Sequence, residues 1–285
     1  MEPIRAILLP GAVLPAQEAY GALIEALGPD VQAVAKDLEI YADSEPPPGW
    51  SLDTEIDGVL RDADALGWET FHLAGYSGGG AAALAFAAKH PERLLSLALL
   101  EPAWAGSWDW SPAHAAVWKK FGELEALPPD QLLPAFMRLG VKSDVVLPPP
   151  PPGPPPPWMA KRPAGIKAFL RTFRSYDLDR ARLAAFRPPV FFALGGLSNP
   201  DDYGEIAGRL ARVFFPDFHL EVFPRRHHFD PPHRMEPVRL AELLRRHWEQ
   251  AERGRAGRAD NFSTMPRVTL ESSTEEILDD LRGDR

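Results

Sequence analysis

The sequence from Phe71 to Gly80 reads FHLAGYSGGG, and it decides the fold of this chain. Its first half is an apolar run typical of a buried strand, and the small residues that follow, from Ala81 to Ala88, are typical of a helix. A sharp turn between strand and helix needs residues without side chains on either side of its centre, and Gly75 and Gly79 meet that need. The pattern predicts a strand, a tight turn and a helix, with Ser77 projecting from the turn.

Short apolar runs bounded by turn residues recur on both sides of this motif. We expect strands at Ile4–Leu9, Val31–Lys36, Thr70–Ala74, Leu94–Leu100, Val190–Leu194 and Phe218–Phe223. Stretches with helical periodicity alternate with them, at Ala16–Leu27, Leu52–Leu66, Gly78–His90, Tyr203–Phe214 and Glu236–Glu252. This alternation predicts an α/β fold with a mostly parallel sheet covered by helices on both faces.

The alternation stops between Ala103 and Pro188. Helical patterns lie there at Pro112–Leu127, Asp130–Leu139 and Pro163–Phe186. They are interrupted by residues 148–157, which are almost all proline and favour a stiff polyproline II spacer. Five of the eight tryptophans also fall in this stretch, where they either roof an apolar substrate pocket or form a small core of their own.

These patterns divide the chain into three parts. Residues 1–102 and 188–252 form the α/β core, and residues 103–187 form a helical cap inserted into it. Residues 253–285 form a charged tail that we expect to be flexible, apart from a helical pattern at Thr274–Arg282.

Composition narrows the range of partners. The 40 acidic residues exceed the 31 Lys and Arg residues and give a net charge of −9, so nucleic acid and anionic membrane surfaces are expected to repel the chain. We therefore expect a small-molecule substrate, no nucleic acid and no membrane, while the oligomeric state stays open. No apolar run reaches the roughly 18 to 20 residues that span a bilayer, and no secretory signal is visible, so we expect a cytoplasmic protein. The absence of cysteine excludes a thiolate nucleophile.

The position of Ser77 favours a role as nucleophile. At a helix N-terminus, free backbone amides and the positive end of the helix dipole stabilise developing negative charge, and the amide of Gly78 is the first such donor. A serine hydroxyl also needs a base, and a neutral imidazole suits that task near pH 7. Serine and base act together with a third residue, which must be a carboxylate that reaches the other imidazole nitrogen.

The motif and its surroundings resemble the α/β-hydrolase superfamily over residues 4–252. In that family a His-Gly pair follows the first core strand, and the amide of the next residue is the second oxyanion donor. Residues 8–13 read LLPGAV here, with Pro10 in place of the usual histidine. The resemblance therefore implies Ala12 as the second oxyanion donor, with Val13 next.

The resemblance also places the base after the last strand, in the sequence RRHHFD of residues 225–230. In the family this position usually has the sequence Gly-His-x-x, followed by a Glu-Pro pair at the start of the final helix. His228 with Glu236-Pro237 fits this pattern best, and His227 is the alternative base.

The acid departs from the family's usual pattern. Gly-x-x-Asp usually follows the penultimate strand, whereas residues 195–202 read GGLSNPDD, with Asn199 where the acid would stand. A second family solution places the acid after the preceding strand, and Glu101 stands there. We favour Glu101 as the acid, with Asp201 as the alternative.

The identity of the nucleophile narrows the class of reaction. Dehalogenases and epoxide hydrolases of this fold use Asp at this turn, and Ser77 argues against both. The sequence therefore predicts a serine hydrolase that acts through a Ser-His-acid triad and an acyl-enzyme on a small or medium carboxylic ester, without a metal or cofactor. Two alternatives are a binding module whose triad has decayed, and lyase or perhydrolase chemistry on the same residues.

Overall fold

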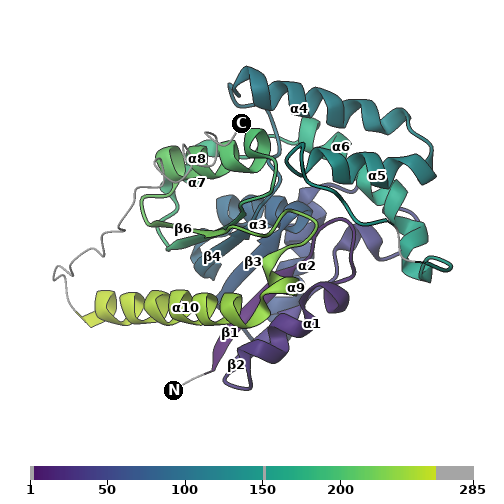
Figure 1. Cartoon of the computed structure of the whole chain (residues 1–285). Helices are drawn as coiled ribbons and strands as arrows, with labels where there is room; N and C mark the ends of the chain where they lie inside the picture. Colours follow the sequence, from purple (N-terminus) through teal and green to yellow (C-terminus); the bar gives the residue numbers. More distant parts are fainter. Residues whose placement is uncertain (1–2, 150–151, 261–285) are drawn as a thin grey trace.

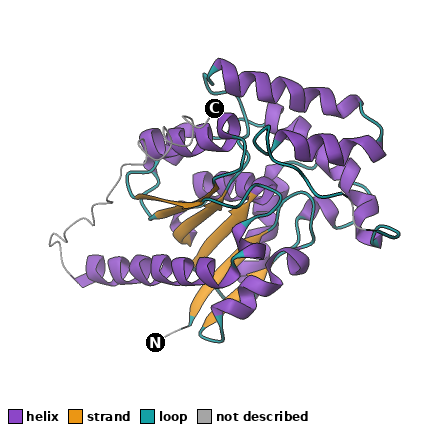
Figure 2. Ribbon diagram, in the orientation of Figure 1, coloured by secondary structure: helices purple, strands orange, loops and turns teal. Residues whose placement is uncertain are grey.

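The computed structural model describes residues 3–149 and 152–260, and a sheet of six strands lies at its centre (Figure 2). The strands are β1 (Ile4–Leu9), β2 (Val31–Ala35), β3 (Phe71–Tyr76), β4 (Leu94–Leu100), β5 (Val190–Gly195) and β6 (Phe218–Phe223). They are parallel throughout, in the order β2-β1-β3-β4-β5-β6. The predicted fold class, an α/β fold with a parallel sheet, is confirmed.

Helices cover both faces of this sheet because strand residues alternate between them. The helices of the core are α1 (Ala16–Leu27), α2 (Leu52–Ala65), α3 (Ser77–Lys89), α8 (Glu205–Arg209), α9 (Pro232–Met235) and α10 (Pro237–Asp260). On β1, Leu8 faces a cluster with Tyr20 of α1 and Trp248 of α10, whereas Ile7 faces a second cluster with Phe86 of α3. Figure 1 shows α1 and α10 lying against the same face.

Residues 103–187 contain α4 (Pro112–Glu123), α5 (Pro129–Leu139), α6 (Arg162–Ser175) and α7 (Arg180–Ala185). Figure 1 shows α4, α5 and α6 grouped at one end of the molecule, whereas α7 lies next to α8. A single helix from Pro163 to Phe186 was therefore a wrong prediction. The chain leaves α6 after Ser175, and the carboxylate of Asp179 caps a new helix by accepting a hydrogen bond from the amide of Arg182 at 3.0 Å.

Short helical turns join the longer elements. The 3-10 turns are η1 (Glu39–Tyr41), η2 (Pro91–Arg93), η3 (Leu124–Ala126) and η4 (Pro157–Lys161), and the π turns are η5 (Pro200–Gly204) and η6 (Leu210–Phe214). The helix expected at Tyr203–Phe214 is thus α8 flanked by two π turns. It starts earlier than expected because the side chain of Asn199 caps it by accepting a hydrogen bond from the amide of Asp201.

The final helix α10 continues to Asp260, beyond the end expected at Glu252. The helical pattern at Thr274–Arg282 lies outside the described residues. Within the described ranges, each helix is too short or too polar to cross a bilayer.

Candidate active site

Ser77 lies at the junction of β3 and α3, where the chain turns without a connecting loop. Its φ of 53° falls in the left-handed region, which a non-glycine residue adopts only at a cost of roughly 1 to 3 kcal/mol. The flanking glycines make the turn possible, since a Cβ at Gly75 would collide with the carbonyl oxygen of Gly79, and a Cβ at Gly79 with that of Pro10. The structure thus has the strand-turn-helix that the sequence predicted.

The side chains of Ser77, His228 and Glu101 form one line. The Nε2 atom of His228 lies 3.0 Å from the Ser77 Oγ, and its Nδ1 atom lies 3.0 Å from the Oε2 of Glu101. All three residues are buried, with 8%, 1% and 4% of their surface exposed. A carboxylate at Nδ1 favours the tautomer that carries its proton there, which leaves Nε2 free to accept the serine proton.

Glu101 directly follows β4, in a strained conformation like that of Ser77. Its φ is 46°, and these two are the non-glycine residues with positive φ in the part of the chain that the structure describes. Its Oε1 accepts a hydrogen bond of 2.7 Å from the amide of Gly195 at the end of β5, while Oε2 faces His228. Both carboxylate oxygens are therefore fixed by contacts at the carboxyl edge of the sheet.

The alternative candidates occupy other positions. The Nδ1 of His227 accepts a hydrogen bond from the amide of Phe229, and the carbonyl of Asp201 lies 3.0 Å from the Nδ1 of His114. Asn199 has a structural role, since its side chain donates a hydrogen bond to the carbonyl of Leu139. The structure thus brings Ser77, His228 and Glu101 together, and not His227 or Asp201.

Aromatic rings hold the imidazole of His228 from several sides. The ring of Tyr203 stacks on it at 4.2 Å and 12°, and Phe229 meets it edge-on at 4.9 Å. The hydroxyl of Tyr76 donates a hydrogen bond to the His228 carbonyl. Sequence reasoning missed Tyr203, because its position depends on the π turn η5, which leaves no periodic signal.

The loop after β1 lies against the serine. A Cβ at Gly11 would come within 3.1 Å of the Ser77 Cβ, the amide of Gly79 donates to the Pro10 carbonyl at 3.0 Å, and the Tyr41 hydroxyl donates to the Ala12 carbonyl at 2.6 Å. Gly78 is the second residue of α3, where a helix has no carbonyl one turn earlier to accept its amide. Both predicted oxyanion donors, Gly78 and Ala12, therefore belong to segments that border Ser77.

Aromatic side chains of residues 103–187 lie close to the residues beside this line. A Cβ at Gly78 would lie 3.0 Å from the ring of Phe169 on α6, and Phe136 on α5 meets Phe229 at 5.7 Å. Trp104 stacks on Phe214 of η6 at 5.8 Å and 2°, so this tryptophan joins the cap segment to the core. Phe169 therefore brings an apolar ring to the residue that follows Ser77.

A buried polar cluster links α4 to the π turn beside His228. The carboxylate of Asp202 accepts a hydrogen bond from the Trp118 Nε1 at 3.2 Å and lies 3.6 Å from the Nδ1 of His114. Burial raises the pKa of Asp202 to about 7 and lowers the pKa of His114 to about 4. Sequence reasoning missed this cluster, since its members lie far apart along the chain.

The sheet, the serine turn and the residues at the carboxyl ends of β3, β4 and β6 together define the α/β-hydrolase fold. The sequence model of a family described as alpha/beta hydrolase fold matches residues 11–138. The chain therefore has the α/β-hydrolase fold, and residues 11–138 resemble that family in sequence, as the motif around Ser77 indicated. No curated protein matches it significantly.

Solved structures of several hydrolases share this fold. A thermophilic esterase from Thermogutta terrifontis superposes with a TM-score of 0.64 and 19% identity, over 87% of this chain and 90% of the esterase. A meta-cleavage product hydrolase from Pseudomonas fluorescens gives 0.60 and 18%, over 88% of this chain and 92% of the hydrolase. Naproxen esterase from Bacillus subtilis gives 0.55 and 21%, over 86% and 83% of the two chains. At these identities the similarity establishes the fold.

Proposed function

We propose that this protein is a serine hydrolase that cleaves a small or medium carboxylic ester through an acyl-enzyme. The observation that carries the proposal is the line from the Ser77 Oγ through His228 to Glu101, with both hydrogen-bond distances at 3.0 Å. Two solved structures of the same fold are described as esterases, which agrees with this chemistry.

The geometry suits a two-step mechanism. The Nε2 of His228 takes the proton of Ser77 as the Oγ attacks the acyl carbonyl, and Glu101 stabilises the imidazolium that forms. The amides of Gly78 and Ala12 stabilise the negative charge on the carbonyl oxygen. His228 then passes its proton to the departing alcohol, leaving an acyl group on Ser77.

Water completes the reaction. His228 takes a proton from a water molecule, the resulting hydroxide attacks the acyl carbonyl, and His228 returns the proton to the Ser77 oxygen as the carboxylic acid leaves. Every proton is carried by one imidazole. A binding module whose triad has decayed would not need this alignment of all three side chains, so we favour the hydrolase over the binding module.

A fluorophosphonate probe tests the proposal. It should label the wild type, and Ser77→Ala should abolish labelling and lower kcat on p-nitrophenyl esters by about 10⁴- to 10⁶-fold. Ser107→Ala, which changes an exposed serine, is the control and should keep both the labelling and the kcat of the wild type. A wild type that is neither labelled nor active on any acyl length would refute the proposal, and analysis of the products separates hydrolysis from lyase or perhydrolase chemistry.

A further inference from the structure

Arg162, the first residue of α6, is a buried cation. Only 3% of its surface is exposed, its Nε has no hydrogen-bond partner, and no carboxylate forms an ion pair with it among the described residues. Lys36 is also buried, but it pairs with Glu39 and Asp62. A guanidinium cannot lose its charge in a protein, so burying it unpaired is costly unless a ligand supplies the partner.

Aromatic rings offset part of the free-energy cost of burying the Arg162 charge. The Arg162 guanidinium lies 3.8 Å from the centre of the Tyr41 ring and 5.4 Å from that of Trp158. Tyr41 is itself fixed to the site, because its hydroxyl donates to the carbonyl of Ala12. The cation is thus one side chain away from the loop that borders the serine.

Helix α6 connects Arg162 to the nucleophile along one face. Arg162, Gly165 and Phe169 are spaced three and four residues apart, so they share a side of the helix. Phe169 covers Gly78, and Gly165 lies directly against the Tyr41 ring. Seven residues of helix rise about 10 Å, which sets the separation between the two ends of this face.

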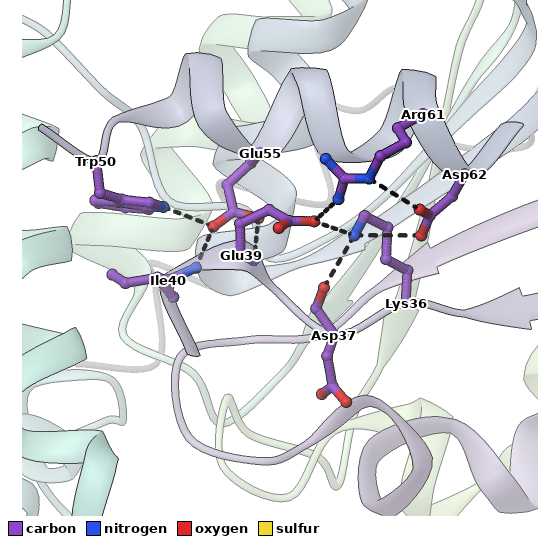
Figure 3. A network of polar contacts seen from close by, with 8 residues as sticks. All are labelled: Lys36, Asp37, Glu39, Ile40, Trp50, Glu55, Arg61 and Asp62. Carbon is purple, nitrogen blue, oxygen red and sulfur yellow. Dashed lines mark hydrogen bonds and ion pairs between the residues drawn. The ribbon is translucent and has the colours of Figure 1, made fainter. Parts of the chain in front are cut away.

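Two carboxylates that contact the segment carrying Tyr41, those of Glu39 and Glu55, are already engaged, as Figure 3 shows. Glu55 accepts hydrogen bonds from the amides of Glu39 and Ile40 and from the Trp50 Nε1, at 2.8 to 3.0 Å. Glu39 pairs with Lys36 and Arg61. This network fixes the segment that carries Tyr41, and it directs both of these carboxylates to groups other than Arg162.

We propose that Arg162 binds a carboxylate of the substrate, so that the preferred substrate is an ester whose anionic end lies about 10 Å from the scissile carbonyl. A single planar guanidinium matches one carboxylate through two parallel hydrogen bonds, whereas a phosphate dianion would leave charge unpaired. The substrate class rests on the proposed hydrolase function, but the anion site itself does not.

Two matched esters test the substrate class. p-Nitrophenyl hydrogen suberate carries a terminal carboxylate, and p-nitrophenyl methyl suberate is its neutral counterpart with the same leaving group. The wild type should prefer the anionic ester, as judged by the ratio of the two kcat/KM values. Arg162→Gln should lower this ratio about 10- to 100-fold, chiefly through KM for the anionic ester, and Arg162→Lys should fall between, since it keeps the charge but loses the planar fork.

Arg171→Gln is the matched control, because it removes the same charge from an exposed position of the same helix and should leave the ratio unchanged. A wild type that hydrolyses both esters equally well, or a ratio that Arg162→Gln does not change, would overturn the inference.

Calorimetry separates this inference from the proposed function. The Ser77→Ala variant should bind monomethyl suberate but not dimethyl suberate, and adding Arg162→Gln should remove the binding. Binding of this kind without hydrolysis by the wild type would refute the hydrolase and leave the anion site standing. Hydrolysis of neutral esters without such binding would refute the anion site alone.

Discussion

Single residues in strained conformations mark the site. Ser77 and Glu101 both adopt positive φ. Helix α3 begins at the serine, and the amide of Gly195 donates a hydrogen bond to the carboxylate of Glu101. Such strain persists only where its surroundings over-determine it. The two side chains that face His228 are therefore preorganised before any substrate binds.

The acid assignment gives the first prediction. Glu101→Gln should lower kcat by about 10⁴-fold, because an amide holds the wrong His228 tautomer and cannot stabilise the imidazolium. Asp201→Asn should stay within a few-fold of the wild type. Steady-state kinetics on a p-nitrophenyl ester compare the two, and the opposite order of effects would move the acid to Asp201.

A second prediction concerns Tyr203, a positioning residue whose ring stacks on His228. Tyr203→Leu should lower kcat about 10-fold or more with little change in KM, because the imidazole loses its stacking partner. Tyr203→Phe keeps the ring and should rescue kcat. Equal losses in both variants would assign the effect to the hydroxyl instead.

A third prediction concerns His233, which is fully buried between the rings of Tyr20 and Tyr76. Burial lowers its pKa from 6.5 to about 3, so the unfolded chain binds the proton more tightly. Stability from this group is present above pH 6.5 and is lost as the pH falls toward 3, by about 2 kcal/mol at pH 5.

Urea denaturation at pH 7 and pH 5 measures this loss. His233→Phe should keep the ring and reduce the fall in the free energy of unfolding by about 2 kcal/mol. His90→Gln, at a partly exposed histidine, is the control. An unchanged pH dependence in His233→Phe would contradict the prediction.

At the scale of elements, the strands and the helices α4 and α5 were predicted well, and the single helix expected at Pro163–Phe186 was not. Each strand is a short apolar run ended by a turn residue, so its limits are visible in the sequence, as at β4 and β6. The break between α6 and α7 depends on the Asp179 cap, which interrupts no apolar pattern. Glu101 was found through its place after a strand, whereas Asp202 and Tyr203 depend on a π turn.

The turn between β3 and α3 gives a fourth prediction. Gly75→Ala should destabilise the protein by about 2 kcal/mol or more and reduce activity, because its Cβ would meet the Gly79 backbone, which cannot move aside. Gly21→Ala within α1 meets only the flexible Gln17 side chain and should stabilise by about 0.5 to 1 kcal/mol. Denaturant titration measures both, and effects of the same sign would contradict this account.

At the scale of the whole molecule, core and cap segment share one hydrophobic cluster. It joins Leu99 and Phe192 of the sheet to Phe121, Leu132 and Phe169 of the cap segment. We therefore expect a single cooperative unfolding transition. Tryptophan fluorescence, which reports mainly on residues 103–187, and far-ultraviolet circular dichroism should give coincident curves. An earlier fluorescence transition would show that the cap segment unfolds by itself.

The segment between β4 and β5 leaves and re-enters the sheet at neighbouring positions, since Leu100 pairs with Ala193. A chain excursion whose ends already meet can be lengthened, shortened or replaced at little entropic cost to the scaffold. Selection can therefore act on residues 103–187, Arg162 included, while Ser77, Glu101 and His228 stay in place. If the proposed hydrolase takes its selectivity from this segment, exchanging residues 103–187 between chains of the same fold should change the range of esters cleaved and leave Ser77, Glu101 and His228 in line.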